Sequence, residues 1–63
     1  MGQTTRFIRM TELKEKVALS RSQIYKLIQQ GEFPEPIKLG KKISVWTDHE
    51  VEEWMSSKLP TQH

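Results

Sequence analysis

The sequence predicts one small α+β domain, mainly helical, in which two helices, a β-hairpin and a third helix follow one another. Three observations predict it: apolar residues recur at helical spacing in three segments, capping signals precede these segments, and Pro34 and Pro36 exclude helix just before a hairpin pattern. A chain of 63 residues without cysteine forms a single domain that depends on packing, caps and turns. We place the domain at residues 6–58 and expect flexible termini at 1–5 and 59–63.

The first helix is expected at Thr11–Val17. Its expected N-cap is Thr11, whose hydroxyl can accept a hydrogen bond from an unpaired amide of the first turn. Glu12 follows, and a carboxylate is favourable at the positive end of the helix dipole. Ala18 and Leu19 then lead into a short turn before the next helix.

The second helix, expected at Arg21–Gln30, has the clearest boundaries. Ser20 and Gln23 have the spacing of a capping box, in which each side chain accepts a hydrogen bond from the other residue's backbone amide. Gly31 supplies the left-handed residue that ends the helix. One side of the helix is apolar and consists of Ile24, Leu27 and Ile28. The opposite side contains no acid and consists of Ser22, Tyr25, Lys26 and Gln29, with Arg21 at its flank.

A hairpin and a third helix are expected after the second helix. Phe33 is a large apolar residue in a polar connection, so we expect it to enter the core. Ile37–Leu39 and Ile43–Trp46 flank Gly40-Lys41-Lys42, which predicts two strands joined by a basic turn. The third helix is expected to open with a second capping box, Thr47 to Glu50, and its apolar stripe consists of Val51, Trp54 and Met55.

The net charge is only +2, but it is unevenly distributed along the chain. Met1 to Trp46 contains nine basic and four acidic residues, whereas Thr47 to His63 contains one basic and four acidic residues. Such an asymmetry is typical of a protein that turns one face toward a polyanion and another away from it. Charge alone leaves open an ordinary solvated surface.

Two short helices joined by a tight turn, the second with a polar outer face, predict a helix-turn-helix that reads the DNA major groove. A guanidinium can bind guanine edges or phosphate, an ammonium can bind phosphate, and an amide can bind adenine. The alternative is an amphipathic helix with a merely solvated outer face, but such faces usually mix Glu with Lys. The candidate DNA-binding residues of this helix are Ser20, Arg21, Ser22, Tyr25, Lys26 and Gln29.

The basic hairpin provides a second indication of double-stranded DNA as the partner. Lys38, Lys41 and Lys42 lie on or beside the expected turn, where ammonium groups can reach phosphates or the minor groove. Lysines on a hairpin also prevent edge-to-edge aggregation, and this alternative stays open when the hairpin is considered alone. Together with the second helix, the hairpin predicts a winged helix-turn-helix domain.

Several motifs resemble those of the AlpA family of prophage regulatory proteins over about residues 6–55. The motifs are Phe7-Ile8-Arg9-Met10, Leu19-Ser20-Arg21-Ser22 with Tyr25, Gly31-Glu32-Phe33-Pro34-Glu35-Pro36, Lys38-Leu39-Gly40, Trp46 and Glu50-Val51-Glu52-Glu53-Trp54. The resemblance implies a winged-helix, MerR-like domain that acts as an excisionase or as a transcriptional regulator of an integrase gene. The polar N-terminus without a secretory signal and the absence of cysteine predict a cytoplasmic location. The resemblance implies a tyrosine-type integrase as a further partner. It also places Ser20, Arg21, Ser22, Tyr25 and Lys26 on the recognition helix, and Lys41 and Lys42 on the wing.

One position departs from the family pattern, because Ser44 stands where an apolar residue is usual. Alternation along a strand places Ser44 and Trp46 on one face and Ile43 and Val45 on the other. If Trp46 packs inward, either the register is shifted, which we favour, or Ile43 and Val45 form a contact surface.

No catalytic group, cofactor site or metal site is expected. His49 is explained as a solvated neighbour of the third helix cap, and the carboxylates of that helix point in scattered directions. No apolar run approaches the roughly 20 residues needed to cross a membrane, so no membrane partner is expected. A single domain of this size offers a small DNA footprint. We therefore expect it to bind DNA as several copies side by side or together with a partner recombinase. The alternatives are a plain transcriptional regulator without a role in excision, or a small protein-protein adaptor.

Overall fold

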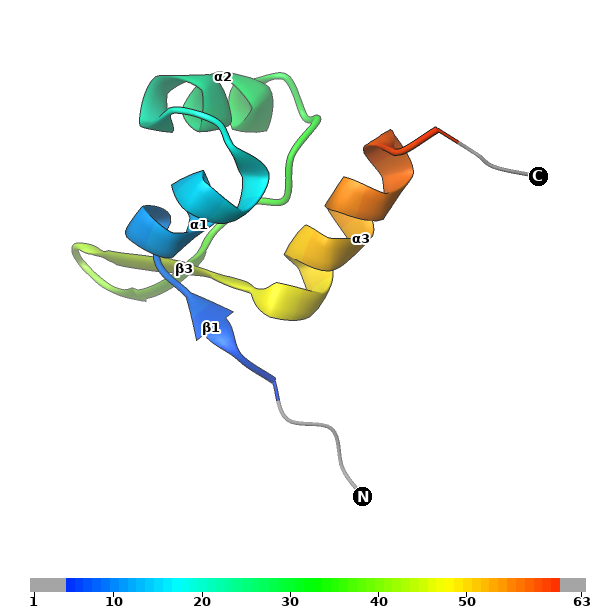
Figure 1. Ribbon diagram of the computed structural model, residues 1–63. Helices are drawn as coiled ribbons and strands as arrows, with labels where there is room; N and C mark the ends of the chain where they lie inside the picture. The colour runs from blue at the N-terminus through cyan, green and yellow to red at the C-terminus, as the bar shows by residue number, and fades with distance from the viewer. Residues whose placement is uncertain (1–4, 61–63) are drawn as a thin grey trace.

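The computed structural model describes residues 5–60 and shows three helices and a three-stranded antiparallel sheet (Figure 1). The elements in chain order are β1 (Phe7–Ile8), α1 (Met10–Val17), α2 (Arg21–Gln29), β2 (Ile37–Gly40), β3 (Ile43–Thr47) and α3 (Asp48–Lys58). The three predicted helices and the predicted hairpin are thereby confirmed. Of the flexible termini predicted at 1–5 and 59–63, residues 1–4 and 61–63 lie outside the described residues. No helix in the described part of the chain is long and apolar enough to span a membrane.

Helix α1 starts earlier than predicted, and the prediction of Thr11 as its N-cap is wrong. The N-cap is Arg9, which has an extended backbone and makes no side-chain capping hydrogen bond. The reason is strand β1, which ends one residue before Arg9 and delivers an extended chain directly to the first turn. At the other end, Ala18 adopts a left-handed conformation with φ of 60° and turns the chain toward α2.

Helix α2 follows the sequence prediction closely. Its capping box is complete: the amide of Gln23 donates to Ser20 Oγ at 3.1 Å, and the amide of Ser20 donates to Gln23 Oε1 at 2.9 Å. The helix ends one residue earlier than predicted, with Gln30 as its C-cap. Gly31 takes the expected left-handed conformation, with φ of 75°. Both ends of α2 are therefore defined by local sequence.

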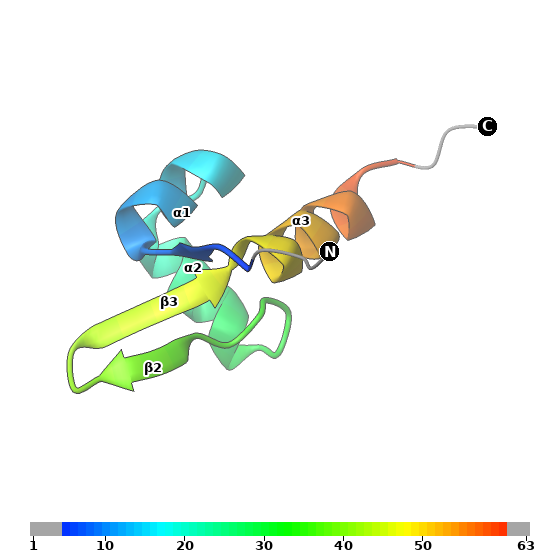
Figure 2. The same cartoon turned by 90° about the horizontal axis from the view of Figure 1, so that it is seen from below.

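Strand β1 was not predicted. It pairs antiparallel with β3, with Ile8 opposite Trp46, and thereby makes β3 the central strand in the order β1-β3-β2 (Figure 2). Strands β2 and β3 form the predicted hairpin with Lys41 and Lys42 in the turn. The pairing is irregular between Lys38 and Gly40, where β2 contains one more residue than β3. The hairpin extends away from the helices.

The core takes one buried side chain from each helix, from β1 and β3, and from the segment between α2 and β2, but none from β2. Its buried members are Ile8, Leu13, Ile24, Phe33, Trp46 and Val51. Trp46 is fully buried, and its indole Nε1 donates a hydrogen bond to the Pro34 carbonyl at 2.9 Å. Phe33 enters the core as predicted and meets the half-buried Trp54 edge to face, with ring centroids 4.8 Å apart. The segment between α2 and β2 is therefore anchored by both tryptophans.

Both Val45 and Trp46 are buried, which the alternation in β3 did not predict. Trp46 belongs to the core together with its strand partner Ile8, whereas Val45 is buried outside that cluster. Neighbouring residues of a strand point to opposite faces, so Val45 lies on the far face of the sheet, where it pairs with Ile37. Ile43 on the same face is 38% exposed. A shifted register in β3 is therefore not needed to bury Val45.

Helix α3 begins immediately after the sheet. The Thr47 hydroxyl accepts a hydrogen bond from the amide of Glu50 at 3.1 Å, which is one of the two hydrogen bonds of the predicted capping box. Val51 on the inner side of α3 is fully buried, and Trp54 and Met55 pack against the core as predicted.

Candidate nucleic-acid interface

The exposed side of α2 carries no carboxylate. Every exposed residue of the helix is basic or neutral and polar: Arg21, Ser22, Gln23, Tyr25, Lys26 and Gln29. The Arg21 guanidinium lies 5.6 Å from the centre of the Tyr25 ring, so the two side chains are held together at the start of the helix. This surface offers many hydrogen-bond donors and nothing that would repel a phosphate.

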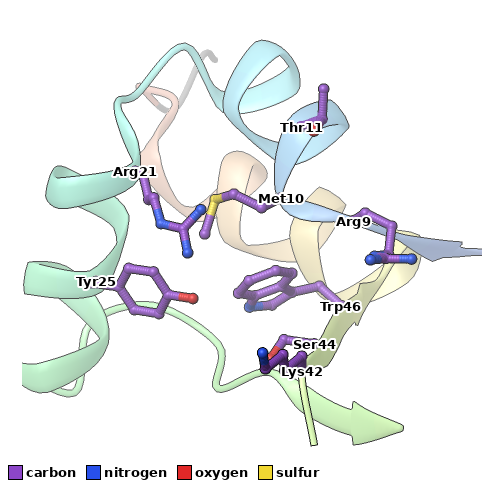
Figure 3. A pocket seen from close by; sticks show the side chains of 8 residues that line it. All are labelled: Arg9, Met10, Thr11, Arg21, Tyr25, Lys42, Ser44 and Trp46. Carbon is purple, nitrogen blue, oxygen red and sulfur yellow. The ribbon is translucent and has the colours of Figure 1, made fainter. Parts of the chain in front are cut away.

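A pocket of about 470 Å³ lies beside this surface, between α2, the start of α1 and the hairpin (Figure 3). We call it the cation-lined pocket; its lining residues are Arg9, Met10, Thr11, Arg21, Tyr25, Lys42, Ser44 and Trp46. Three of these residues are cations, and they come from three different segments of the chain. Three others carry hydroxyl groups, and no carboxylate lines the pocket. Such a lining suits an anion.

The structure brings together some of the sequence-predicted site residues but not all of them. Arg21, Tyr25 and Lys42 line the cation-lined pocket. The others are exposed outside it: Ser22, Lys26 and Gln29 on α2, Lys38 on β2 and Lys41 in the turn. Ser20 caps α2, so its hydroxyl oxygen already accepts a hydrogen bond.

Arg9, Thr11 and Ser44 line the pocket but were not predicted as site residues. Arg9 and Thr11 follow strand β1, whose pairing with β3 no local pattern predicts. Strand alternation had placed Ser44 on the same face as Trp46 but gave it no role in a site. The only sequence signal for Arg9 was its place in a motif shared with the AlpA family. Thr11 had been interpreted as a helix cap, and without that role its side chain is available to the pocket.

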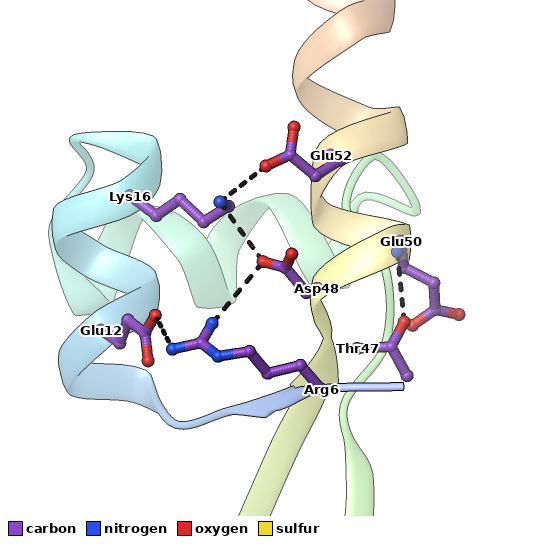
Figure 4. Close-up of polar contacts among 7 residues, drawn as sticks. All are labelled: Arg6, Glu12, Lys16, Thr47, Asp48, Glu50 and Glu52. Carbon is purple, nitrogen blue, oxygen red and sulfur yellow. Dashed lines mark hydrogen bonds and ion pairs between the residues drawn. The ribbon is translucent and has the colours of Figure 1, made fainter. Parts of the chain in front are cut away.

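A second set of charges, on the other side of β1, is neutralised within the protein (Figure 4). We call it the ion-pair cluster; its members are Arg6, Glu12, Lys16, Asp48 and Glu52. The Arg6 guanidinium lies 2.7 Å from a Glu12 carboxylate oxygen. The Lys16 ammonium lies 2.7 Å from Glu52 and 3.3 Å from Asp48. The cluster therefore ties β1 and α1 to the start of α3.

These contacts shift the pKa values of the two cations upward and so favour their charged forms. The hydrogen bond with Glu52, and then the contact with Asp48, raises the pKa of Lys16 above its ordinary value. The hydrogen bond and the charge of Glu12 raise the pKa of Arg6 in the same way. Of the nine basic residues between Met1 and Trp46, only these two form ion pairs within residues 5–60. The acids of α1 and α3 thus neutralise cations away from the pocket and leave the pocket positive.

The fold and the pocket define a small α+β domain with a basic, acid-free surface on α2. The chain belongs to the AlpA family of prophage regulatory proteins, a family of regulators rather than of enzymes. The family model described as Prophage CP4-57 regulatory protein (AlpA) matches residues 6–59.

A similar protein from Enterobacteria phage P4, described as uncharacterized protein ORF88, is 44% identical over 54 residues. The match covers 86% of this chain and 61% of the phage protein, so the chain spans less than two thirds of that relative. No solved structure was found to match the chain.

Proposed function

We propose that the protein is a sequence-specific DNA-binding regulator of a prophage or genomic island, built as a winged helix-turn-helix domain. The observation that carries the proposal is the acid-free outer face of α2, which continues into the cation-lined pocket and the basic hairpin. Membership of the AlpA family supports a regulatory role. In this proposal α2 is the recognition helix and the β2–β3 hairpin is the wing.

The proposed roles follow from where the side chains lie. Arg21, Ser22 and Tyr25 belong to the first half of α2, the part of a recognition helix that usually meets base edges. Lys26 and Gln29 extend the same exposed side toward its C-terminal end. Lys38, Lys41 and Lys42 of the hairpin contact the phosphate backbone in this proposal. The tight turn at Ala18 between α1 and α2 supports the helix-turn-helix arrangement.

We propose excision as the main role, with the protein bending DNA at attachment sites beside a tyrosine-type integrase. The size of the domain supports binding of several copies side by side, because one copy covers few base pairs. Four exposed apolar side chains also favour protein contacts: Phe7, Ile37, Leu39 and Ile43. Regulation of an integrase gene without excision is the second candidate. Footprints on the attachment site and the integrase promoter separate them: several phased sites with bending indicate excision, and one unbent operator indicates repression.

The DNA-binding proposal is tested by duplex binding at a series of salt concentrations. If about 4–6 phosphates are contacted, log affinity should fall with log salt at a slope of about −4 to −5. Arg21→Ala and Lys26→Ala should weaken binding while the circular dichroism spectrum stays unchanged. Lys58→Ala is the matched control, because Lys58 is a cation at the end of α3 and lies over Trp54. Failure of the wild-type protein to bind any duplex at low salt would reject the proposal and favour an adaptor.

A further inference from the structure

We infer that the cation-lined pocket binds one phosphodiester group of the DNA backbone, with Arg9 as a contact residue outside both the recognition helix and the wing. This inference rests on the proposed DNA-binding function and deepens it. It adds a third segment, the start of α1, to the DNA interface. It also gives the interface one fixed phosphate position, lined by Arg9, Arg21 and Lys42, beside the other exposed residues of α2.

The chemistry of the lining fits a phosphate. Arg9, Arg21 and Lys42 approach the pocket from the start of α1, from α2 and from the hairpin turn (Figure 3). Guanidinium and ammonium groups only donate hydrogen bonds, and phosphate oxygens only accept them. The hydroxyls of Thr11 and Ser44 add donors of the same kind. Because no carboxylate lines the pocket, no acid of the lining neutralises the three positive charges, and an anion that enters the pocket can do so.

The position of Arg9 shows why it serves the pocket while Arg6 does not. The two arginines flank strand β1 and are separated by an odd number of positions, so an extended chain directs them to opposite faces. Arg6 meets Glu12 and Asp48 on its face. Arg9 has an extended backbone, is exposed and makes no ion pair within residues 5–60. Its guanidinium is therefore available to a ligand.

The buried floor of the pocket favours a backbone group over a base. Trp46 forms part of the lining, but it is fully buried and its Nε1 already donates to Pro34. Its ring is therefore fixed and has no exposed face on which a base could stack. Phosphates on the rim of a groove are the parts of a duplex that a pocket between a recognition helix and a wing would meet first.

The test uses a duplex selected by the wild-type protein from a random-sequence pool. Arg9→Gln should bind this duplex about tenfold more weakly at low salt, because one charge-assisted hydrogen-bond partner is lost. Its salt slope should be smaller than that of the wild type by about 1. Arg9→Lys should retain the wild-type slope. Lys58→Gln, which removes a cation from α3, should leave both quantities unchanged.

Methylphosphonate linkages, which lack the phosphate charge, then locate the contact. Each linkage of the selected duplex is neutralised in turn, and the wild type is compared with Arg9→Gln and Lys42→Gln. A neutral linkage at one position should abolish the loss of affinity of both variants relative to the wild type, since both side chains line one pocket. The inference is overturned if Arg9→Gln binds like the wild type, if its penalty persists at every position, or if the two variants respond at different phosphates. If the wild type selects no duplex, the proposed function itself fails.

Discussion

Arg6 and Arg9 stand at the two ends of one short strand, yet they lie in opposite electrostatic settings. Arg6 is held by Glu12 at 2.7 Å in the ion-pair cluster, whereas Arg9 lines a pocket without a carboxylate. The same contrast separates Lys16, which contacts two acids of α3, from Lys42 in the hairpin turn. A basic composition alone therefore does not identify a binding surface. What marks the candidate surface is that its cations line one pocket together and are left unpaired by the protein's own acids.

The acidic third helix has a defined part in this division. Asp48 and Glu52 at the start of α3 face α1, where they meet Lys16. These carboxylates therefore stabilise the contact between α1 and α3 and lie outside the cation-lined pocket. The small net charge of +2 conceals this separation. This separation of charges also explains how a chain with a small net charge can present a strongly basic pocket.

Trp46 belongs both to the core and to the pocket lining, so its removal should have the largest effect. Its ring fills the core and also lines the cation-lined pocket. We expect Trp46→Ala to lower the free energy of unfolding by about 3–5 kcal/mol, which is comparable to the whole stability of so small a domain. Urea unfolding followed by circular dichroism measures it.

Trp46→Phe is the intermediate variant, since it keeps an aromatic ring in the core but removes the hydrogen bond to Pro34 and part of the buried ring. It should fold with a smaller loss, about 1–3 kcal/mol, from the unpaired carbonyl and the smaller side chain. A Trp46→Ala variant as stable as the wild type would mean that the core does not depend on this ring.

The parts of the fold that the sequence predicts are those determined by neighbouring residues. The capping box of α2 and its terminal glycine involve positions only a few residues apart, and both are present as predicted. Strand β1 was missed because two residues are too short to show a period, and the strand exists only through its pairing with β3. The same omission caused the wrong N-cap for α1, since the strand fixes where that helix begins.

The candidate site divides in the same way. Arg21, Tyr25 and Lys42 could be predicted because a helix face and a hairpin turn can be read from local spacing. Arg9 could not, because it reaches the pocket through the pairing of β1 with the distant strand β3. The sequence also could not show which cations form ion pairs within the protein, since this depends on contacts between α1 and α3. That these residues bind DNA stays a prediction.

A pair of helix caps tests the two regions with equal perturbations. Ser20 caps α2 beside the pocket, and Thr47 caps α3 beside the ion-pair cluster, and each oxygen accepts one backbone hydrogen bond at 3.1 Å. Ser20→Ala and Thr47→Ala should each cost about 1 kcal/mol of stability. Only Ser20→Ala should also weaken duplex binding, measured well below the unfolding midpoint. Equal binding by both variants would remove Ser20 from the interface and leave it a structural cap.

The smallest effect is expected in the ion-pair cluster, and its sign can be given. Because the pKa of Lys16 is raised in the folded protein, its contribution to stability is fully present below the ordinary lysine value. It is lost as pH rises through the raised folded value. The difference in unfolding free energy between the wild type and Lys16→Gln should therefore be constant near neutral pH and shrink under strongly alkaline conditions.

Lys14→Gln is the matched control, because Lys14 lies on the same helix, is exposed and forms no ion pair within residues 5–60. It should show no such pH-dependent difference. Duplex binding by Lys16→Gln should equal that of the wild type, since this cation is already neutralised by Asp48 and Glu52. Arg9→Gln is expected to reduce the salt slope of DNA binding. If Lys16→Gln reduced it as well, then ion pairing within the protein would not distinguish the structural cations from the DNA-binding ones. The distinction between Arg6 and Arg9 would then need another physical basis.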